Sequence, residues 1–160
     1  MNIKDFGRLF YSTTSQISII IRLSRYASKF GILGKFLSIL LDNALLHLYG
    51  IELSSRTLDI KNLIVGHSTG VVLGGNGIRC TGTLRISSGV VFGRRYDSSK
   101  PIEQNGVFFD VDGDLTIGSN SVLLGPLKIK GPVTIGALSL VTHDITEPGN
   151  YVGIPVRKLA

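Results

Sequence analysis

The chain has 160 residues, enough for one domain with a hydrophobic core, and a formal net charge of +6. Its 20 glycines, its lack of tryptophan and its 18% of charged residues favour a turn-rich repeat over a helical bundle. The single cysteine, Cys80, excludes a disulfide framework and a cysteine-rich zinc site, and we expect a buried, unreactive thiol. The positive charge fits plain solubility or attraction to an anionic ligand or membrane, and no aromatic–basic motif points to nucleic acid.

Residues 1–50 are predicted to form an N-terminal helical region. Apolar residues recur at steps of three and four over 15–30 and again over 36–48, which is typical of two amphipathic helices. Glycines between them, Gly34 included, are expected to break the first helix, and Gly50 is expected to cap the second.

Two roles are open for this helical region. It can cap the exposed end of the domain that follows, or its basic stripe of Arg22, Arg25 and Lys29 can lie on an anionic membrane surface. The apolar run 17–21 is too short for a signal peptide and is followed by Arg22. Because no segment is expected to reach the length of a membrane span, we expect a cytoplasmic protein, with peripheral contact to the inner face of the membrane as an extension of that expectation.

The central repeat has a period of six. An aliphatic side chain occupies every sixth position of one stretch: Val111, Ile117, Leu123, Ile129, Ile135 and Val141. A helix repeats at 3.6 and a strand at 2, so a period of six indicates a unit of one short strand and one turn. Three such units make one triangular coil of a parallel β-helix, which predicts a mainly β fold.

Before that stretch the repeat is less regular. Asp59 breaks the phase of the first coil, and the glycines of 74–77 indicate one extra residue. The repeat vanishes over 94–106, which is polar and predicts a loop that protrudes from one face. We therefore expect a β-helix domain over 51–160, with a tail at 148–160 that leaves the repeat.

Two motifs carry a resemblance to a known family. Residues 135–145 read IGALSLVTHDI and are followed by Gly153-Ile154-Pro155-Val156-Arg157, a pattern that resembles the last coil of left-handed parallel β-helix (hexapeptide-repeat) acyltransferases. The stretches 49–53, YGIEL, and 67–72, HSTGVV, are similar to the serine acetyltransferase branch, as is a helical region before the β-helix. The resemblance implies a homotrimer that binds acetyl-CoA in the groove between neighbouring β-helices.

Acetyl transfer from a thioester to a hydroxyl needs a base near neutral pH, and histidine is the usual one. Of the three histidines, His67 matches the catalytic histidine of the family, which implies that it is the general base. His143 would line the cofactor groove, and His47 is expected in packing or at the surface. The serine acetyltransferase branch has an aspartate before the catalytic histidine where this chain has Gly66, so Asp97, Asp110 or a backbone carbonyl is a candidate to orient the ring.

The acceptor is expected to be a sugar hydroxyl in surface polysaccharide biosynthesis. The serine branch grips its amino acid with a second histidine, but this chain has Lys100 in the nearest stretch and no histidine between 68 and 142. Amino-acid acetylation of the serine acetyltransferase type, or a non-catalytic β-helix scaffold, remains the alternative. A three-histidine zinc enzyme of this fold is excluded because the repeat region holds only His67 and His143, so no metal is expected.

The cofactor contacts are carried over from the family one by one. The resemblance implies that these residues contact acetyl-CoA: Ser119, Ala137 through its backbone amide, Thr142, His143, Arg157 and the neighbouring Lys158. Backbone donors along a flat wall suit the pantetheine arm, and cations suit the phosphates.

Overall fold

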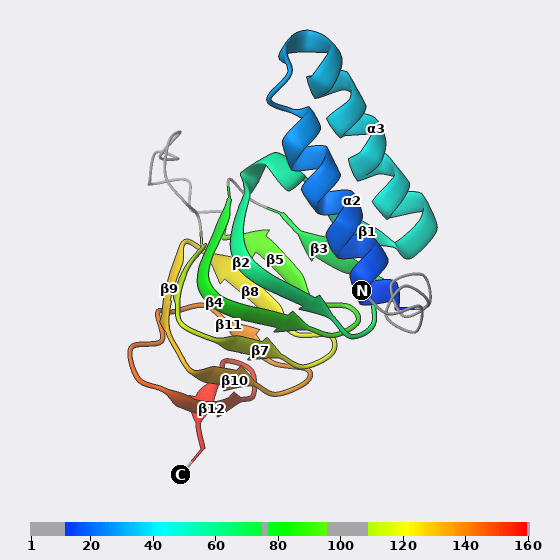
Figure 1. The fold of residues 1–160 in the computed structure, drawn as a ribbon. Helices are drawn as coiled ribbons and strands as arrows, with labels where there is room; N and C mark the ends of the chain where they lie inside the picture. Colours follow the sequence, from blue (N-terminus) through cyan, green and yellow to red (C-terminus); the bar gives the residue numbers. More distant parts are fainter. Residues whose placement is uncertain (1–11, 75–76, 96–108, 160) are drawn as a thin grey trace, which may run out of the picture.

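The computed structural model describes residues 12–74, 77–95 and 109–159 (Figure 1). Two helices are followed by a β-solenoid of about four turns, so the fold is mainly β as predicted. Of the loop predicted near 94–106, Arg94 and Arg95 are described, and the rest lies outside the described residues.

The helices α2 (Thr13–Ala27) and α3 (Gly31–Tyr49) pack side by side and rise from the N-terminal end of the solenoid (Figure 1). Gly50 ends α3 in the left-handed conformation, with φ 65°, as predicted. Gly34 does not break a helix, contrary to the prediction, but lies inside α3. A Cβ at Gly34 would lie 2.1 Å from the carbonyl oxygen of Ala27, so this glycine lets the two helices approach closely.

The length of α3 corrects a second expectation. The helix has 19 residues and is apolar enough, by length and composition, to cross a membrane, although the sequence was expected to hold no such segment. Its apolar residues are interrupted by Lys35, Ser38 and Asp42, which had masked the length of the apolar stretch.

The solenoid is built from short strands. A short 3₁₀ helix, η1 (Ser55–Thr57), interrupts the first coil, and the strands are β1 (Ile51–Leu53), β2 (Leu58–Val65), β3 (Val71–Leu73), β4 (Ile78–Ile86), β5 (Val91–Arg94), β6 (Phe109–Asp112), β7 (Leu115–Ile117), β8 (Val122–Gly125), β9 (Leu127–Lys130), β10 (Val133–Ile135), β11 (Leu140–Val141), β12 (Gly149–Val152) and β13 (Arg157–Lys158). Each strand pairs in parallel with the strand one coil away, except that β13 pairs antiparallel with β12.

The strands form three faces. Face 1 is the sheet β1-β3-β5-β8-β11. The other sheet bends into two faces because β2 and β4 are long enough to run around a corner: their first halves lie with β6 and β9 in face 2, and their second halves lie with β7, β10 and β12 in face 3. We call the turn from face 3 to face 1 the 3–1 corner and the turn from face 1 to face 2 the 1–2 corner.

The period of six is the core of the solenoid. All six residues from Val111 to Val141 in the predicted register are buried, with 0–1% of their surface exposed. In the first coil the buried residue is Leu58, which pairs with Ile78, and not Asp59, which is exposed. The shift of one residue keeps a carboxylate out of an apolar core, where its desolvation would be costly.

Candidate functional site

The 3–1 corner that carries His67 is longer than the corners stacked below it. Between the paired strand ends it contains six residues, 66–71, whereas the next three corners contain four each, 87–90, 118–121 and 136–139. The extra length makes this corner the irregular one of the stack.

Backbone hydrogen bonds identify the two extra residues as His67 and Ser68. The N–H of Gly66 donates to the strand end of the next coil (2.9 Å), as the first residue of each lower corner does. The carbonyl of Thr69 accepts the N–H of the next corner (2.9 Å), as the second residue of each of the next two corners does. Gly66 and Thr69 therefore occupy regular positions, and His67 and Ser68 are inserted between them.

The backbone around His67 is fixed while its side chain is available. Val71 N–H bonds to Ser68 O (3.2 Å), and Gly70 N–H bonds to Gly50 O at the end of α3 (3.1 Å). The His67 side chain is exposed and makes no hydrogen bond within the described parts of the chain. An exposed imidazole on an anchored turn can accept a proton from a bound hydroxyl.

Ser119 and Ala137, two of the predicted cofactor contacts, lie on the same 3–1 corner as His67. They occupy equivalent positions in two successive coils, and Ser119 O accepts the N–H of Leu138 (2.9 Å). The coils touch closely here, because a Cβ at Gly118 would lie 2.5 Å from Ala137 N. The corner thus presents a narrow row of backbone groups below His67, which suits an extended, polar arm.

Thr142 and His143 lie on a different corner. They follow β11 at the 1–2 corner, where Thr142 Oγ1 and His143 Nδ1 are 2.8 Å apart. Arg95, at the end of β5, donates from Nη1 to Thr142 O (2.9 Å). The two corners are separated by the width of face 1, which is one strand of two to four residues, or about 10 Å. One chain therefore does not bring Thr142 and His143 to the row below His67.

The tail holds the two predicted cations, Arg157 and Lys158, which form β13 and are exposed. Lys158 Nζ forms an ion pair with Glu147 Oε2 (2.8 Å). The hydrogen bond and the charge of Lys158 lower the pKa of Glu147, and the hydrogen bond from Glu147 is the main cause that raises the pKa of Lys158. Both groups stay charged at neutral pH, so an anion at Lys158 would have to compete with Glu147.

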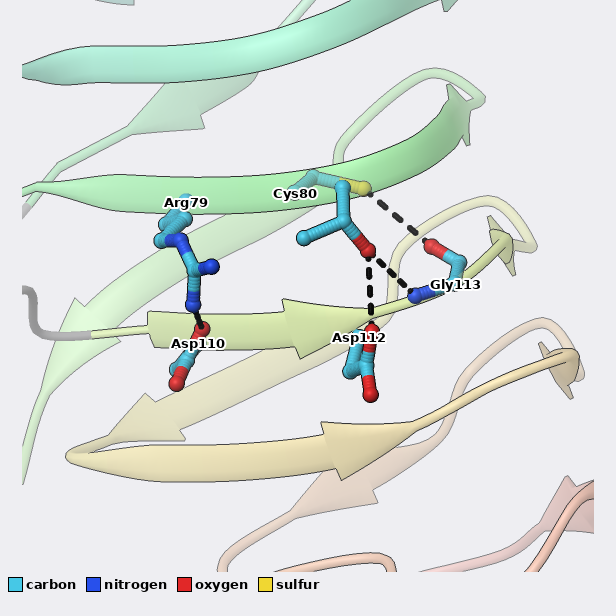
Figure 2. Close-up of polar contacts among 6 residues, drawn as sticks. Arg79, Cys80, Asp110, Asp112 and Gly113 are labelled. Atoms are coloured by element: carbon cyan, nitrogen blue, oxygen red, sulfur yellow. Dashed lines mark hydrogen bonds and ion pairs between the residues drawn. The ribbon is translucent and has the colours of Figure 1, made fainter.

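One of the two candidates to orient His67, Asp110, lies on another face of the same chain. Asp110 lies on β6 in face 2, the face opposite the 3–1 corner, and Asp110 Oδ1 accepts a hydrogen bond from Arg79 Nη1 on β4 (2.8 Å; Figure 2). Within one chain Asp110 therefore lies away from the corner of His67, and its orienting role stays a prediction. Asp97 and Lys100 lie outside the described residues.

The remaining histidine and the cysteine are not part of the site. His47 is exposed on α3. Cys80 is buried as predicted, and its Sγ donates to Gly113 O (3.5 Å; Figure 2). Burial is the main cause that raises the pKa of the Cys80 thiol, which keeps it protonated. No cluster of three His, Cys, Asp or Glu that could hold a metal occurs among the described residues.

Sequence reasoning missed Arg95 and Ser68. The sequence predicts a polar loop that includes Arg95, and only the pairing of β5 with β8 and of β8 with β11 brings Arg95 to Thr142. Ser68 was part of the matched motif, but its place in a two-residue insertion emerges only from the strand register. The signal that could have found it is the spacing from Val65 to Val72, which exceeds the spacing from Ile86 to Val91 by two residues.

Comparisons with solved structures give the fold a family context. Serine acetyltransferase from Neisseria gonorrhoeae matches with a TM-score of 0.73 and 25% identity, over 96% of this chain and 57% of that one. The soybean enzyme, complexed with serine, matches with 0.74 and 19% identity over 96% and 60%. The Brucella abortus enzyme, in complex with coenzyme A, matches with 0.71 and 18% identity over 91% and 55%.

The chain has the fold of the serine acetyltransferases. This confirms the predicted left-handed parallel β-helix with an N-terminal helical region. The chain spans less than two thirds of the length of these structures, and neither a protein-family model nor a curated protein matches it. Within the serine acetyltransferase fold, His67 lies on the long 3–1 corner, which bonds through Gly70 N–H to Gly50 O at the end of α3.

Proposed function

We propose that the protein is an acetyl-CoA-dependent O-acetyltransferase with His67 as its general base. The observation that carries the proposal is the inserted pair His67–Ser68, which projects one free imidazole from an otherwise regular stack of corners in a serine acetyltransferase fold. In the reaction His67 takes the proton of the acceptor hydroxyl while the hydroxyl oxygen attacks the carbonyl carbon of the thioester. The C–S bond then breaks, and the departing thiolate of coenzyme A takes that proton from the imidazolium.

The site we propose needs two copies of the chain. Ser119 and Ala137 lie on the 3–1 corner and Thr142 and His143 on the 1–2 corner, so a groove lined by both corners forms only where one solenoid meets another. A closed ring of copies repeats this contact without leaving an open corner, and the homotrimer that we propose is such a ring. The pantetheine arm of acetyl-CoA would follow the row of backbone groups, and Arg157 would face its phosphates.

The acceptor we propose is a sugar hydroxyl of a surface polysaccharide precursor. Gly66 stands before His67 without a carboxylate, and the described residues bring no second histidine to that corner. Both features speak against a site that grips a charged amino acid. Serine is the second candidate, because the soybean enzyme of the same fold is complexed with it. Acetyl-CoA and activated sugars are both made in the cytoplasm, where we place the protein.

The test follows release of coenzyme A thiol with acetyl-CoA and a panel of acceptors that includes sugars, nucleotide sugars and serine. His67→Ala should lower turnover about 10²–10⁴-fold, because a general base contributes about that factor. The matched control His47→Ala replaces an exposed histidine on α3, outside the 3–1 corner, and should leave turnover unchanged.

Binding of acetyl-CoA tests the cofactor groove separately from the role of His67 as the base. Acetyl-CoA should raise the melting temperature of His67→Ala as much as that of the wild type, because a ligand that binds only the folded state stabilises it. If acetyl-CoA shifts neither protein, the chain is a non-catalytic scaffold. If serine alone is acetylated, the sugar acceptor is wrong while the transferase assignment stands.

A further inference from the structure

The helical hairpin of α2 and α3 buries polar side chains where its two helices meet. Between the helices lie Ser24, Ser38 and Asp42, all at most 9% exposed, together with Ser55 of η1. Ser24 Oγ donates to Asp42 Oδ1 (2.8 Å), and Ser55 N–H donates to Asp42 Oδ2 (3.1 Å). The polar side chains that a water-exposed helix pair usually turns outward are thus paired with each other inside.

The outer surface of the hairpin is largely apolar around its turn. Around its turn, seven large apolar side chains are 49–88% exposed, and we call them the tip patch: Leu23, Tyr26, Phe30, Ile32, Leu33, Phe36 and Leu37. The turn lies at the far end of the molecule from the C-terminus, where the solenoid does not cover it (Figure 1). A contiguous apolar patch of this kind marks a surface that meets something other than water.

Cations border the tip patch. An open groove beside it is lined by Arg22, Arg25, Lys29 and Arg56, with Tyr26 shared between groove and patch. None of these four cations has an ion pair within the described residues. The one acidic side chain in the two helices is Asp42, which is buried, so the exposed surface of the hairpin carries positive charge alone.

We propose that the tip patch docks on an anionic phospholipid surface, with the cationic groove over the lipid phosphates. Apolar side chains beside unpaired Arg and Lys, with aromatic rings at the boundary, are what an interfacial membrane segment requires. A second copy of the chain fits less well, because two such hairpins would bring cations against cations with no exposed carboxylate to pair with.

Charge and packing also favour docking over spanning. The buried Ser24–Asp42 bond ties α3 to α2, so a span would carry Arg22, Arg25 and Lys29 into the hydrocarbon with it. At the interface the same cations remain at the level of the headgroups. Each cation near an anionic surface strengthens binding about fivefold.

The test is flotation of the full chain with vesicles of pure phosphatidylcholine or with one part in three of phosphatidylglycerol. We expect binding to the anionic vesicles alone and release at about 0.5 M salt, where screening shortens the Debye length to about 4 Å. Ile32→Ser with Leu33→Ser should weaken binding at least tenfold, and Arg22→Gln with Lys29→Gln about 25-fold. Circular dichroism checks that each variant keeps its helices.

Two matched controls keep the test specific. Leu48→Ser removes an exposed leucine at the other end of α3, and Lys130→Gln removes an exposed cation from face 2; neither should change binding. Equal binding to both vesicle types, or equal loss with the controls, overturns the proposal. If the wild type binds no vesicles and the double variant Ile32→Ser with Leu33→Ser forms a smaller oligomer, the tip patch is a contact between copies of the chain and the proposal is wrong. Retention in membranes through an alkaline wash shows a span.

Discussion

At one position of each 3–1 corner the backbone has a positive φ. Gly70, Gly89 and Asn120 occupy it in the first three coils, with φ 72°, 67° and 59°. Leu138 occupies it in the fourth, with φ 55°, although its side chain is 66% exposed. Glycine and asparagine tolerate this conformation, whereas other residues are strained by about 1–2 kcal/mol.

We therefore expect Leu138→Asn to stabilise the protein by about 0.5–1 kcal/mol, because the strain removed exceeds the small apolar burial lost. Thermal unfolding measures the effect, which should be a rise of about 2 °C. Asn120→Leu at the equivalent position should shift the melting temperature in the opposite direction. A lower melting temperature for Leu138→Asn would mean that the exposed leucine is covered in the assembled protein.

The thiol of Cys80 gives a prediction about reactivity. Because its pKa is raised by burial, the fraction of reactive thiolate at mildly alkaline pH is smaller than for a free cysteine. Iodoacetamide should therefore leave the folded protein unmodified and alkylate Cys80 fully in concentrated guanidinium chloride. Mass spectrometry reads both results, and fast alkylation of the native protein would contradict the buried position.

Among the elements, the long 3–1 corner is the most informative. Deleting His67 and Ser68 leaves Gly66-Thr69-Gly70-Val71, a corner of the same length as Ser87-Ser88-Gly89-Val90. We expect the deletion variant to fold with its helices and strands intact, to bind acetyl-CoA and to lose turnover. Circular dichroism, the acetyl-CoA thermal shift and the thiol assay measure the three properties.

Unfolding of this variant would show that the insertion supports the fold. In that case the corner is structural, and the assignment of His67 rests on His67→Ala alone. Deletion of Ser88 and Gly89 from the next corner is the matched control; it should destabilise the solenoid, because that corner has no spare residues.

The repeat was predictable because a period of six follows directly from packing one side chain per strand. The shift from Asp59 to Leu58 was not, since a count at fixed steps ignores the local choice between a carboxylate and a leucine. The prediction for Gly34 is wrong because a glycine in a helical pattern indicates a break, whereas here the neighbouring helix leaves no room for a Cβ. His67 could be named from its motif, and its role stays a prediction. The position of Asp110 relative to His67 could not be predicted, because it depends on which face of the solenoid each coil presents.

At the scale of the whole molecule, the proposed site across two chains can be tested by mixing. His67→Ala disables the 3–1 corner, and Thr142→Glu should block the 1–2 corner by repelling the anionic cofactor. Each variant alone should be inactive. When the two variants are mixed in equal amounts and exchange subunits, about one quarter of the interfaces should regain activity. In those interfaces one chain supplies an intact 3–1 corner and its neighbour supplies an intact 1–2 corner.

Failure to regain any activity after verified subunit exchange would place both corners of the site in one chain. Exchange is verified by native mass spectrometry of differently tagged chains. If the Thr142→Glu variant alone is active, Thr142 does not line the cofactor groove. A variant at or beside Ala137 would then have to test whether the site is shared between two chains.

The direct join at Gly50 has one more consequence. With no linker between α3 and β1, the helix acts as a rigid spacer between the hairpin turn and the corner of His67. Nineteen residues of helix span about 28 Å. If the turn rests on a bilayer, the imidazole stands at most about that height above it. An acceptor carried at the membrane would then react only at a group that reaches about that height above the bilayer.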